Sequence, residues 1–280
     1  MIKTRTLPQN NYKAVYVKGK TLRFQLDENL PITELEYPEF YDVKVTSKCN
    51  GQCPYCYQDS KYENKHTPVL ETFKKIFSSL SENDRPFQIA FGGGEPTLHP
   101  EFIDILKASY DLGIVPNYTT NGTNLTSDII DATKKYCGGV AISCHQHLDW
   151  EKGFKKLVEN GIKTNLHIII SDKDSINRFM MIYAKHRDET SYFVLLPYET
   201  FGRAPHKDID FSYLDSKLTG KEENIAWGAN FYPFLKKAKK YKVSLYEPES
   251  MSKYLDLTLP EPKLYKSSFN LTEVDNKILK

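Results

Sequence analysis

A regular alternation of strand-like and helix-like patterns constrains the fold of this chain more than any other feature. Short apolar or alternating segments predict strands at residues 41–46, 87–91, 115–119, 140–143, 164–170, 192–196 and 243–247. Helical apolar periods lie between them, at about 69–80, 102–110, 127–136, 150–158, 175–188 and 224–241, the last interrupted by Pro233. Strand–helix units repeated about six times predict an α/β fold with a parallel sheet and right-handed crossovers.

These repeated units fit either a closed or partly closed (β/α) barrel or an open doubly wound sheet. Residues 12–27 alternate around Gly19 and predict a β-hairpin, which a proline-punctuated connector follows. No internal repeat or clean linker divides the 280 residues. We therefore expect an N-terminal hairpin extension over 1–38, a main domain over 39–250 and a C-terminal tail over 251–280 that packs on it.

Composition and charge indicate which partners and which cellular compartment to expect for the protein. Hydrophobic residues make up 40% of the chain, which is enough for a packed core. The net charge of +2 does not suggest a nucleic-acid partner or a polybasic membrane anchor. No apolar run approaches the roughly 20 residues that span a bilayer, and the first residues lack the apolar core of a secretory signal. We expect a soluble, cytoplasmic protein without a membrane partner.

Polar and special residues collect directly after the predicted strands. TSKCNGQCPYCYQDS follows the first strand, GGGEPTLHP the second, TTNGTNLT the third and SCHQH the fourth. The junctions that lead from helix to strand, such as DLGI and NGIK, carry no such residues. Function gathers at the carboxyl ends of the strands in parallel βα folds, so we expect the active face at that end.

Three of the five cysteines, Cys49, Cys53 and Cys56, fall within eight positions. An odd count with this clustering is a poor disulfide framework. A structural zinc site would need a fourth ligand from one of the other two cysteines or from a histidine such as His66, and no second ligand pair is present. Three thiolates on a four-iron cluster would leave one iron open to a small molecule. The residues alone leave both kinds of metal site as alternatives.

The motif CNGQCPYCY at 49–57, followed one βα unit later by GGGEP at 92–96, resembles the radical S-adenosylmethionine (radical SAM) superfamily. The resemblance lies in motif order and strand placement over about residues 40–250. Each motif alone is modest, and their combination in the corresponding loops carries the resemblance. It implies a partial (β/α)6 TIM-like barrel.

The resemblance also implies which side chains bind the cofactors. Cys49, Cys53 and Cys56 would ligate three irons of a [4Fe-4S] cluster, and S-adenosylmethionine would chelate the fourth iron through its amino and carboxylate groups. Tyr55, the aromatic residue before the last cysteine, matches a position that packs on adenine.

Three further loops carry residues with an implied role. Gly93, Gly94 and Glu95 match a GGE motif whose edge contacts the methionine amino group, since glycine permits close backbone approach and an acceptor suits an ammonium. Ser143, at the end of the fourth barrel strand, matches a serine near the ribose. Asn121 lies where the third loop lines the pocket, although asparagine–glycine is also a common turn.

The mechanism that the resemblance implies is reductive. An external donor such as flavodoxin or ferredoxin supplies an electron, the S–C5′ bond breaks, and the 5′-deoxyadenosyl radical removes a hydrogen atom from the substrate. The absence of cysteine after Cys144 implies a single-cluster member without a C-terminal auxiliary-cluster domain. We expect a peptide, a protein or a small metabolite as substrate, with a nucleoside or nucleotide as the alternative. A non-catalytic zinc-binding interaction module is the alternative from another class.

Two cysteines stand outside the motif. Cys144 lies at the expected catalytic end, where its thiol is a candidate hydrogen-atom donor; a small half-buried residue is the simpler interpretation. Cys137, at a helix-to-strand junction, is expected to pack in the core. His145, His167 and Arg203 are candidates for the pocket wall, with a solvated loop position or barrel filler as the alternative.

Overall fold

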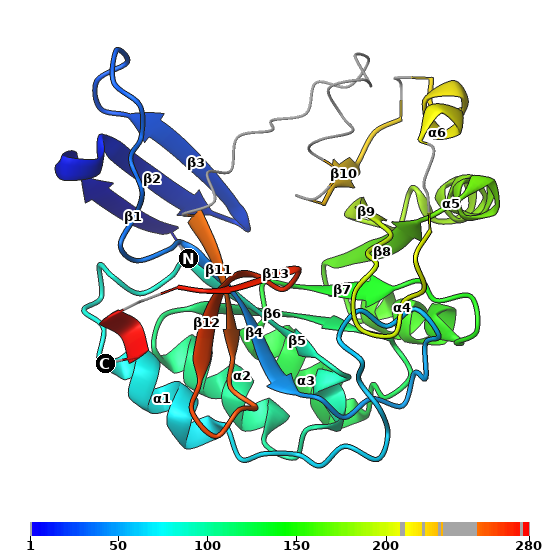
Figure 1. Cartoon of the computed structure of the whole chain (residues 1–280), viewed down its shortest axis with the longest axis horizontal. Helices are drawn as coiled ribbons and strands as arrows, with labels where there is room; N and C mark the ends of the chain where they lie inside the picture. Colours follow the sequence, from blue (N-terminus) through cyan, green and yellow to red (C-terminus); the bar gives the residue numbers. More distant parts are fainter. Residues whose placement is uncertain are drawn as a thin grey trace.

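The structure is a computed structural model that describes residues 2–207, 211–219, 222–228, 231, 251–274 and 277–279. Its centre is a ten-stranded sheet that curls into part of a barrel, with helices along its outer side, and the N-terminal strands form a separate sheet beside it (Figure 1). The partial TIM-like barrel that the resemblance implied is thereby confirmed.

The main sheet is parallel over most of its width. Its parallel strands, in spatial order, are β10 (Ile225–Trp227), β9 (Tyr192–Pro197), β8 (Thr164–Ile170), β7 (Gly139–Ser143), β6 (Val115–Thr120), β5 (Gln88–Gly93), β4 (Phe40–Thr46) and β11 (Ser252–Asp256). The helices are α1 (Leu70–Ser78), α2 (Phe102–Asp111), α3 (Ser127–Tyr136), α4 (Trp150–Glu159), α5 (Lys173–His186) and α6 (Ser212–Lys217). Because each crossover returns the chain in the same direction, the strand carboxyl ends meet at one end of the barrel. Among the described residues, no helix has the length and apolar character that a membrane span requires.

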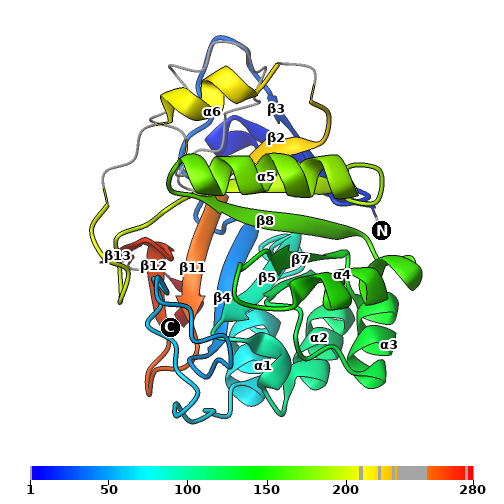
Figure 2. The same ribbon diagram turned by 90° about the vertical axis from the view of Figure 1, so that its right-hand side faces the viewer.

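Strand β8 shows how the sheet separates its two faces. Leu166 and Ile168 are fully buried in the core between sheet and helices, and Figure 2 shows α5 lying along this strand. His167 and Ile169 point to the inner side and line a cavity. Because side chains alternate along a strand, one face of β8 packs in the apolar core and the other face lines the cavity.

The helix predicted at 224–241 is wrong at its start, because the chain there forms strand β10. The open edge of β9 offers unpaired backbone groups, and the Phe193 N–H donates to the Asn224 carbonyl over 2.8 Å. This long-range pairing outweighs the local helical pattern. Pro233 and the strand predicted at 243–247 lie outside the described residues.

The N-terminal extension is an antiparallel sheet of β1 (Ile2–Leu7), β2 (Tyr12–Val17) and β3 (Lys20–Gln25). β2 and β3 form the predicted hairpin, with Lys18 and Gly19 at positive φ in a two-residue turn. Sequence analysis missed β1, because its lysine, threonines and arginine interrupt the apolar alternation.

The C-terminal segment enters the main sheet. β11 pairs in parallel with β4, and Lys44 and Asp256 form an ion pair of 3.2 Å between the two strands. β12 (Lys263–Ser267) and β13 (Asn270–Glu273) continue the sheet in antiparallel order. This pairing covers the edge of β4, which would otherwise present unpaired backbone groups.

An ion pair between the half-buried Arg23 and the buried Glu39 joins the N-terminal sheet to the barrel and yields a stability prediction. Glu39, 2% exposed before β4, accepts hydrogen bonds of 2.9, 3.0 and 3.1 Å from the Arg23 guanidinium and another from the Tyr12 hydroxyl. Glu39→Ala should lower the free energy of unfolding by about 2–4 kcal/mol, since the buried Tyr12 hydroxyl and the half-buried Arg23 guanidinium lose this acceptor. Urea denaturation measures the change. The exposed Glu28→Ala is the control, and an equal effect of both substitutions would contradict the prediction.

Candidate active site

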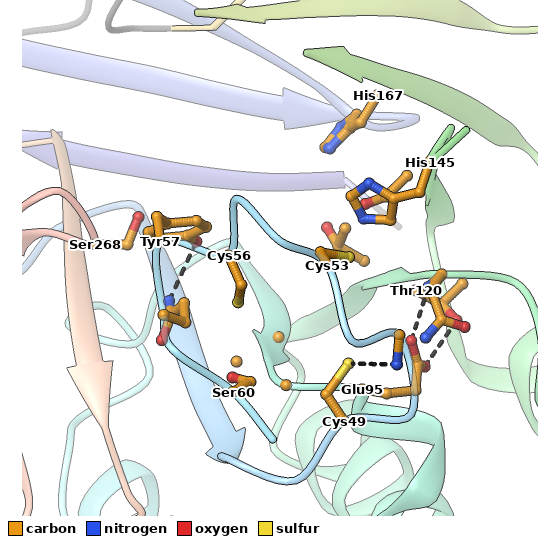
Figure 3. Close-up of a pocket in the computed structure, with 18 of the residues that line it drawn as sticks. Cys49, Cys53, Cys56, Tyr57, Ser60, Glu95, Thr120, His145, His167 and Ser268 are labelled. Atoms are coloured by element: carbon orange, nitrogen blue, oxygen red, sulfur yellow. Dashed lines mark hydrogen bonds between the residues drawn. The ribbon is translucent and has the colours of Figure 1, made fainter. Parts of the chain in front are cut away.

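A cavity of about 290 Å³ lies at the carboxyl ends of the barrel strands, where the polar loops were expected to meet. Strands β4 to β9, the loop after β4 and the C-terminal strands all contribute to its wall. The three motif cysteines border it (Figure 3). The other residues predicted for the site border it as well: Tyr55, Gly93, Gly94, Glu95, Asn121, Ser143 and Cys144.

The three cysteines lie in one loop, and all three line the same cavity. The Gly51 N–H donates to the Cys49 Sγ over 3.3 Å, and a Cβ on Gly51 would lie 3.4 Å from the Sγ atoms of both Cys49 and Cys53. Because Gly51 has no side chain, the space between the Cys49 and Cys53 sulfurs stays open, whereas a larger side chain at this position would fill it. Cys53 is buried, whereas Cys49 and Cys56 are half-buried.

The electrostatics of these thiols fit a metal site. Burial raises the pKa of the Cys53 thiol to about 12, and the neighbouring Cys49 and Cys56 add to the rise. Burial also raises the pKa of Cys49. Neighbouring thiols of this kind deprotonate together when a cation balances their charge. The donor set and the space beside Gly51 therefore fit a thiolate-bound metal group.

The sulfurs of the three motif cysteines border the cavity (Figure 3). In the part of the chain that the structure describes, no three His, Cys, Asp or Glu side chains converge on a position for one metal ion. His66, considered as a fourth zinc ligand, has its Nδ1 3.1 Å from the Thr46 hydroxyl. Cys137 follows α3 and packs against the main core, as expected.

At the end of β5 the backbone lies very close to the residues that precede the cysteines. Only glycine, which has no side chain, permits this close approach. The Gly94 N–H donates to the Thr46 carbonyl over 2.7 Å, and the Glu95 N–H donates to the Lys48 carbonyl over 2.9 Å. A Cβ on Gly94 would lie 2.0 Å from the Lys48 oxygen, and one on Gly93 would lie 2.4 Å from the Thr46 oxygen. The end of β5 therefore docks directly against the start of the cysteine loop.

Both oxygens of the buried Glu95 carboxylate accept hydrogen bonds from the protein. Its Oε1 accepts hydrogen bonds from the Thr97 N–H (3.2 Å), the Thr97 hydroxyl (2.7 Å) and the Thr120 hydroxyl (2.7 Å). Its Oε2 accepts the Asn121 N–H at 2.7 Å. Burial raises the pKa of Glu95, and these hydrogen bonds oppose the rise. The side chain thus ties β5 to the loop after β6, which leaves the backbone of the glycine run to face the cavity.

Asn121 connects the cysteine loop to the loop after β6. Its Nδ2 donates to the Asn50 Oδ1 over 2.7 Å, and the Asn50 Nδ2 donates to the Thr123 hydroxyl over 2.9 Å. Ser143 ends β7 opposite His167 in the strand register and lines the cavity. The ligand contacts expected of Asn121 and Ser143 stay predictions.

Tyr55 stands between the cysteines and a wall that carries histidines. Its hydroxyl lies 3.2 Å from the His145 Nδ1, and the His147 Nε2 lies 2.8 Å from the Gly51 carbonyl. Burial lowers the pKa of His145 to about 4, and the charges of His147 and Arg178 add to this effect. A neutral imidazole therefore faces Tyr55 near pH 7.

Cys144 is 3% exposed and contributes to the cavity wall after β7. Its Sγ lies 3.8 Å from the Ile142 carbonyl, and burial raises the pKa of the thiol. The protonated thiol is the chemical form that a hydrogen-atom donor needs. That role for Cys144 stays a prediction.

The loop after β9 holds the cysteine loop, a contact that sequence analysis missed. Arg203 was considered as part of the pocket wall, but its Nε donates to the Cys53 carbonyl over 2.7 Å and its Nη2 donates to the Ser60 carbonyl over 2.8 Å. Its Nη1 pairs with Asp59 at 3.0 Å. The carbonyl partners lie 150 and 143 residues away in the sequence, so no local pattern could reveal the contact.

Several side chains of the cavity wall were not predicted, among them Arg178 from α5, Tyr254 from β11 and Phe269 from the turn after β12. The ring centroid of Phe269 lies 4.5 Å from that of Tyr57, and the Tyr254 hydroxyl donates to the Gln58 Oε1 over 3.0 Å. The sequence did contain a signal for Arg178, because it lies in the first two turns of α5, the helix that follows the carboxyl end of β8. The C-terminal residues carry no such signal, because a long-range strand pairing brings them to the cavity.

A family model described as the Radical SAM superfamily matches residues 43–147. Over 89 residues, the chain is 32% identical to the tungsten-containing aldehyde ferredoxin oxidoreductase cofactor-modifying protein of Pyrococcus furiosus, covering 31% of this chain and 25% of that protein. Over 82 residues, it is 35% identical to the S-adenosylmethionine-dependent nucleotide dehydratase of Selenomonas ruminantium, covering 29% of each. The chain thus matches less than a third of the length of either relative.

Solved structures of SuiB from Streptococcus suis are similar over more of the chain. SuiB bound to S-adenosylmethionine has a TM-score of 0.73 at 15% identity, covering 100% of this chain and 85% of that chain. SuiB bound to its precursor peptide SuiA has a TM-score of 0.67 at 16% identity, covering 88% of this chain and 64% of that chain. At these identities the likeness concerns the fold alone.

The substitution Gly94→Ala tests the docking of β5 on the cysteine loop. The added Cβ would lie 2.0 Å from the Lys48 oxygen, so the two backbones must move apart. We expect the free energy of unfolding to fall by about 1–3 kcal/mol in urea denaturation of the reduced, metal-free protein. Gly92→Ala is the matched control, because a Cβ there meets no atom within 4 Å. Equal stabilities of the two variants would show that the close approach is not a constraint.

Proposed function

We propose that this chain, which belongs to the radical SAM superfamily, is a single-cluster enzyme of that superfamily. It removes a hydrogen atom from a peptide, a protein or a small metabolite. The observation that carries the proposal is the gathering of three cysteine sulfurs from one loop at a cavity (Figure 3). The glycine run of β5 and the ends of β6 and β7 border the same cavity. One cavity therefore offers both a thiolate site and room for a small cofactor.

In this proposal, Cys49, Cys53 and Cys56 ligate three irons of a [4Fe-4S] cluster. Gly51 leaves the room between sulfurs that such a group needs, and Arg203 holds the loop by its hydrogen bond to the Cys53 carbonyl. When bound and reduced by an external donor such as flavodoxin or ferredoxin, the cluster supplies reductive cleavage of S-adenosylmethionine to the 5′-deoxyadenosyl radical.

The remaining residues of the cavity are proposed to hold S-adenosylmethionine. The backbone of Gly93 and Gly94 approaches its methionine part, Tyr55 packs on the adenine, and Ser143 lies near the ribose. Asn121 supports this pocket through its hydrogen bond to the cysteine loop. The support for these roles is that all five residues border one cavity in the motif order of the superfamily.

Glu95 is proposed as a positioning residue of the cofactor site. Its carboxylate fixes Thr97, Thr120 and Asn121 at the ends of neighbouring strands. On the opposite side, Phe269 packs on Tyr57 and limits the access of water. Excluding water and stray hydrogen donors keeps a reactive radical directed at its substrate.

The names of similar proteins bear on the substrate. The SuiB structure contains a precursor peptide, which agrees with a peptide or protein substrate for this fold. The nucleotide dehydratase acts on a nucleotide by its name, so a nucleoside or nucleotide is the alternative substrate. A non-catalytic zinc-binding module remains the competing proposal from another class.

Anaerobic reconstitution tests the proposed function. With iron and sulfide, the wild-type protein should bind about four irons per chain, and it should form 5′-deoxyadenosine from S-adenosylmethionine and dithionite. Cys53→Ala should lose iron and product, because one of three ligands is removed. Cys137→Ala is the matched cysteine control, since this residue follows α3 and is not part of the cavity wall.

Two outcomes would contradict the proposal. About one zinc per chain without sulfide would favour the interaction module. Formation of 5′-deoxyadenosine that is no greater in the wild type than in Cys53→Ala would refute the enzymatic reaction. Metal content and product are measured on the same anaerobic samples, so that a failed reconstitution is visible.

A further inference from the structure

Arg178 reaches the cavity from α5 and has no partner in the described protein. Its Nε is buried without a hydrogen bond, and no described residue forms a hydrogen bond or ion pair with its guanidinium. The charge nevertheless acts on the cavity wall, because it helps to lower the pKa of His145 and opposes the burial-driven rise in the pKa of Cys144. A buried donor of a charged group without an acceptor is unfavourable and calls for a ligand.

The surrounding wall does not neutralise this cation. Burial lowers the pKa of His145 and of His167 to about 4, so both imidazoles are neutral near pH 7. Both point into the cavity (Figure 3). The acidic residues of the wall are Asp42, on the distant strand β4, and Glu95, whose two oxygens already accept four hydrogen bonds.

A guanidinium presents its N–H groups in a planar fork that matches the oxygens of a carboxylate or a phosphate. We propose that Arg178 binds an anionic group, a carboxylate or a phosphate, of the substrate. The group would accept the hydrogen bond that the buried Nε lacks, and its negative charge would offset the positive charge of Arg178.

The place of Arg178 in the barrel assigns the anion to the substrate and not to S-adenosylmethionine. The glycine run and Asn121 follow β5 and β6, whereas Arg178 belongs to the helix after β8. Ser143 ends β7 and His145 follows it, so in strand order both lie between the two parts of the wall. This inference rests on the proposed function, because it takes the side of β5 and β6 as the cofactor side.

Equilibrium binding of two probe anions tests the inference. Inorganic pyrophosphate and succinate are titrated by calorimetry into the anaerobically reconstituted protein with S-adenosylmethionine present. Arg178→Gln should weaken the binding of the preferred anion by roughly 10-fold or more, since a charge-assisted hydrogen bond is lost. Arg187→Gln is the matched control, because this arginine ends the same helix with its side chain 61% exposed. Arg178→Lys should recover part of the affinity by restoring the charge.

The outcomes separate the possible sources of the anion. A preference for pyrophosphate indicates a phosphate in the substrate, and a preference for succinate indicates a carboxylate; either supports the inference. Binding that Arg178→Gln does not weaken, or no binding by the wild type, overturns it. Weaker binding of S-adenosylmethionine to Arg178→Gln with unchanged anion binding assigns the residue to the cofactor and also overturns it. Anion binding through Arg178 in a protein that forms no 5′-deoxyadenosine contradicts only the proposed function.

Discussion

The site depends on one contact between two backbones, at which the glycine end of β5 lies against the residues that lead into the cysteine loop. The Gly94 N–H reaches the Thr46 carbonyl at 2.7 Å, and the Lys48 oxygen occupies the space where a Gly94 Cβ would stand. Only a residue without a side chain permits this approach. Because the contact joins the first two loops of the barrel, it brings the cysteines and the glycine run to the same cavity.

Hydrogen bonds extend this contact to the next loops. Glu95 ties the end of β5 to Thr120 and Asn121, and Asn121 returns to the cysteine loop through Asn50. Arg203 holds the other side of that loop. Several polar groups around the cavity thus position one another, whereas the Arg178 guanidinium has no partner among the described residues and is available to a ligand.

The central part of the fold was predictable because each segment shows its own period. β8 was predicted at 164–170 and α3 at 127–136, and both have these bounds in the structure. The predictions failed or fell short at sheet edges. β10 overrides a helical pattern, and β1 forms from a segment with little apolar alternation. An edge strand is stabilised by pairing with a neighbouring strand, and where that strand is distant in the sequence, a local sequence pattern cannot reveal the pairing.

The sequence by itself determined which residues can form the metal site and in which loops they lie, because cysteine spacing and glycine runs are local properties of the chain. The resemblance to the superfamily rested on these motifs, and it implied the partial barrel, whereas the strand–helix alternation alone fitted an open doubly wound sheet as well. Only the tertiary structure decided that the Glu95 carboxylate accepts hydrogen bonds from the protein, that Arg203 holds the cysteine loop and that Arg178 has no partner among the described residues. The tertiary structure also decided the pairing of β11 with β4, which brings Tyr254 to the cavity. The physical reason is that hydrogen bonding and burial depend on neighbours distant in sequence, and folding alone brings those neighbours together.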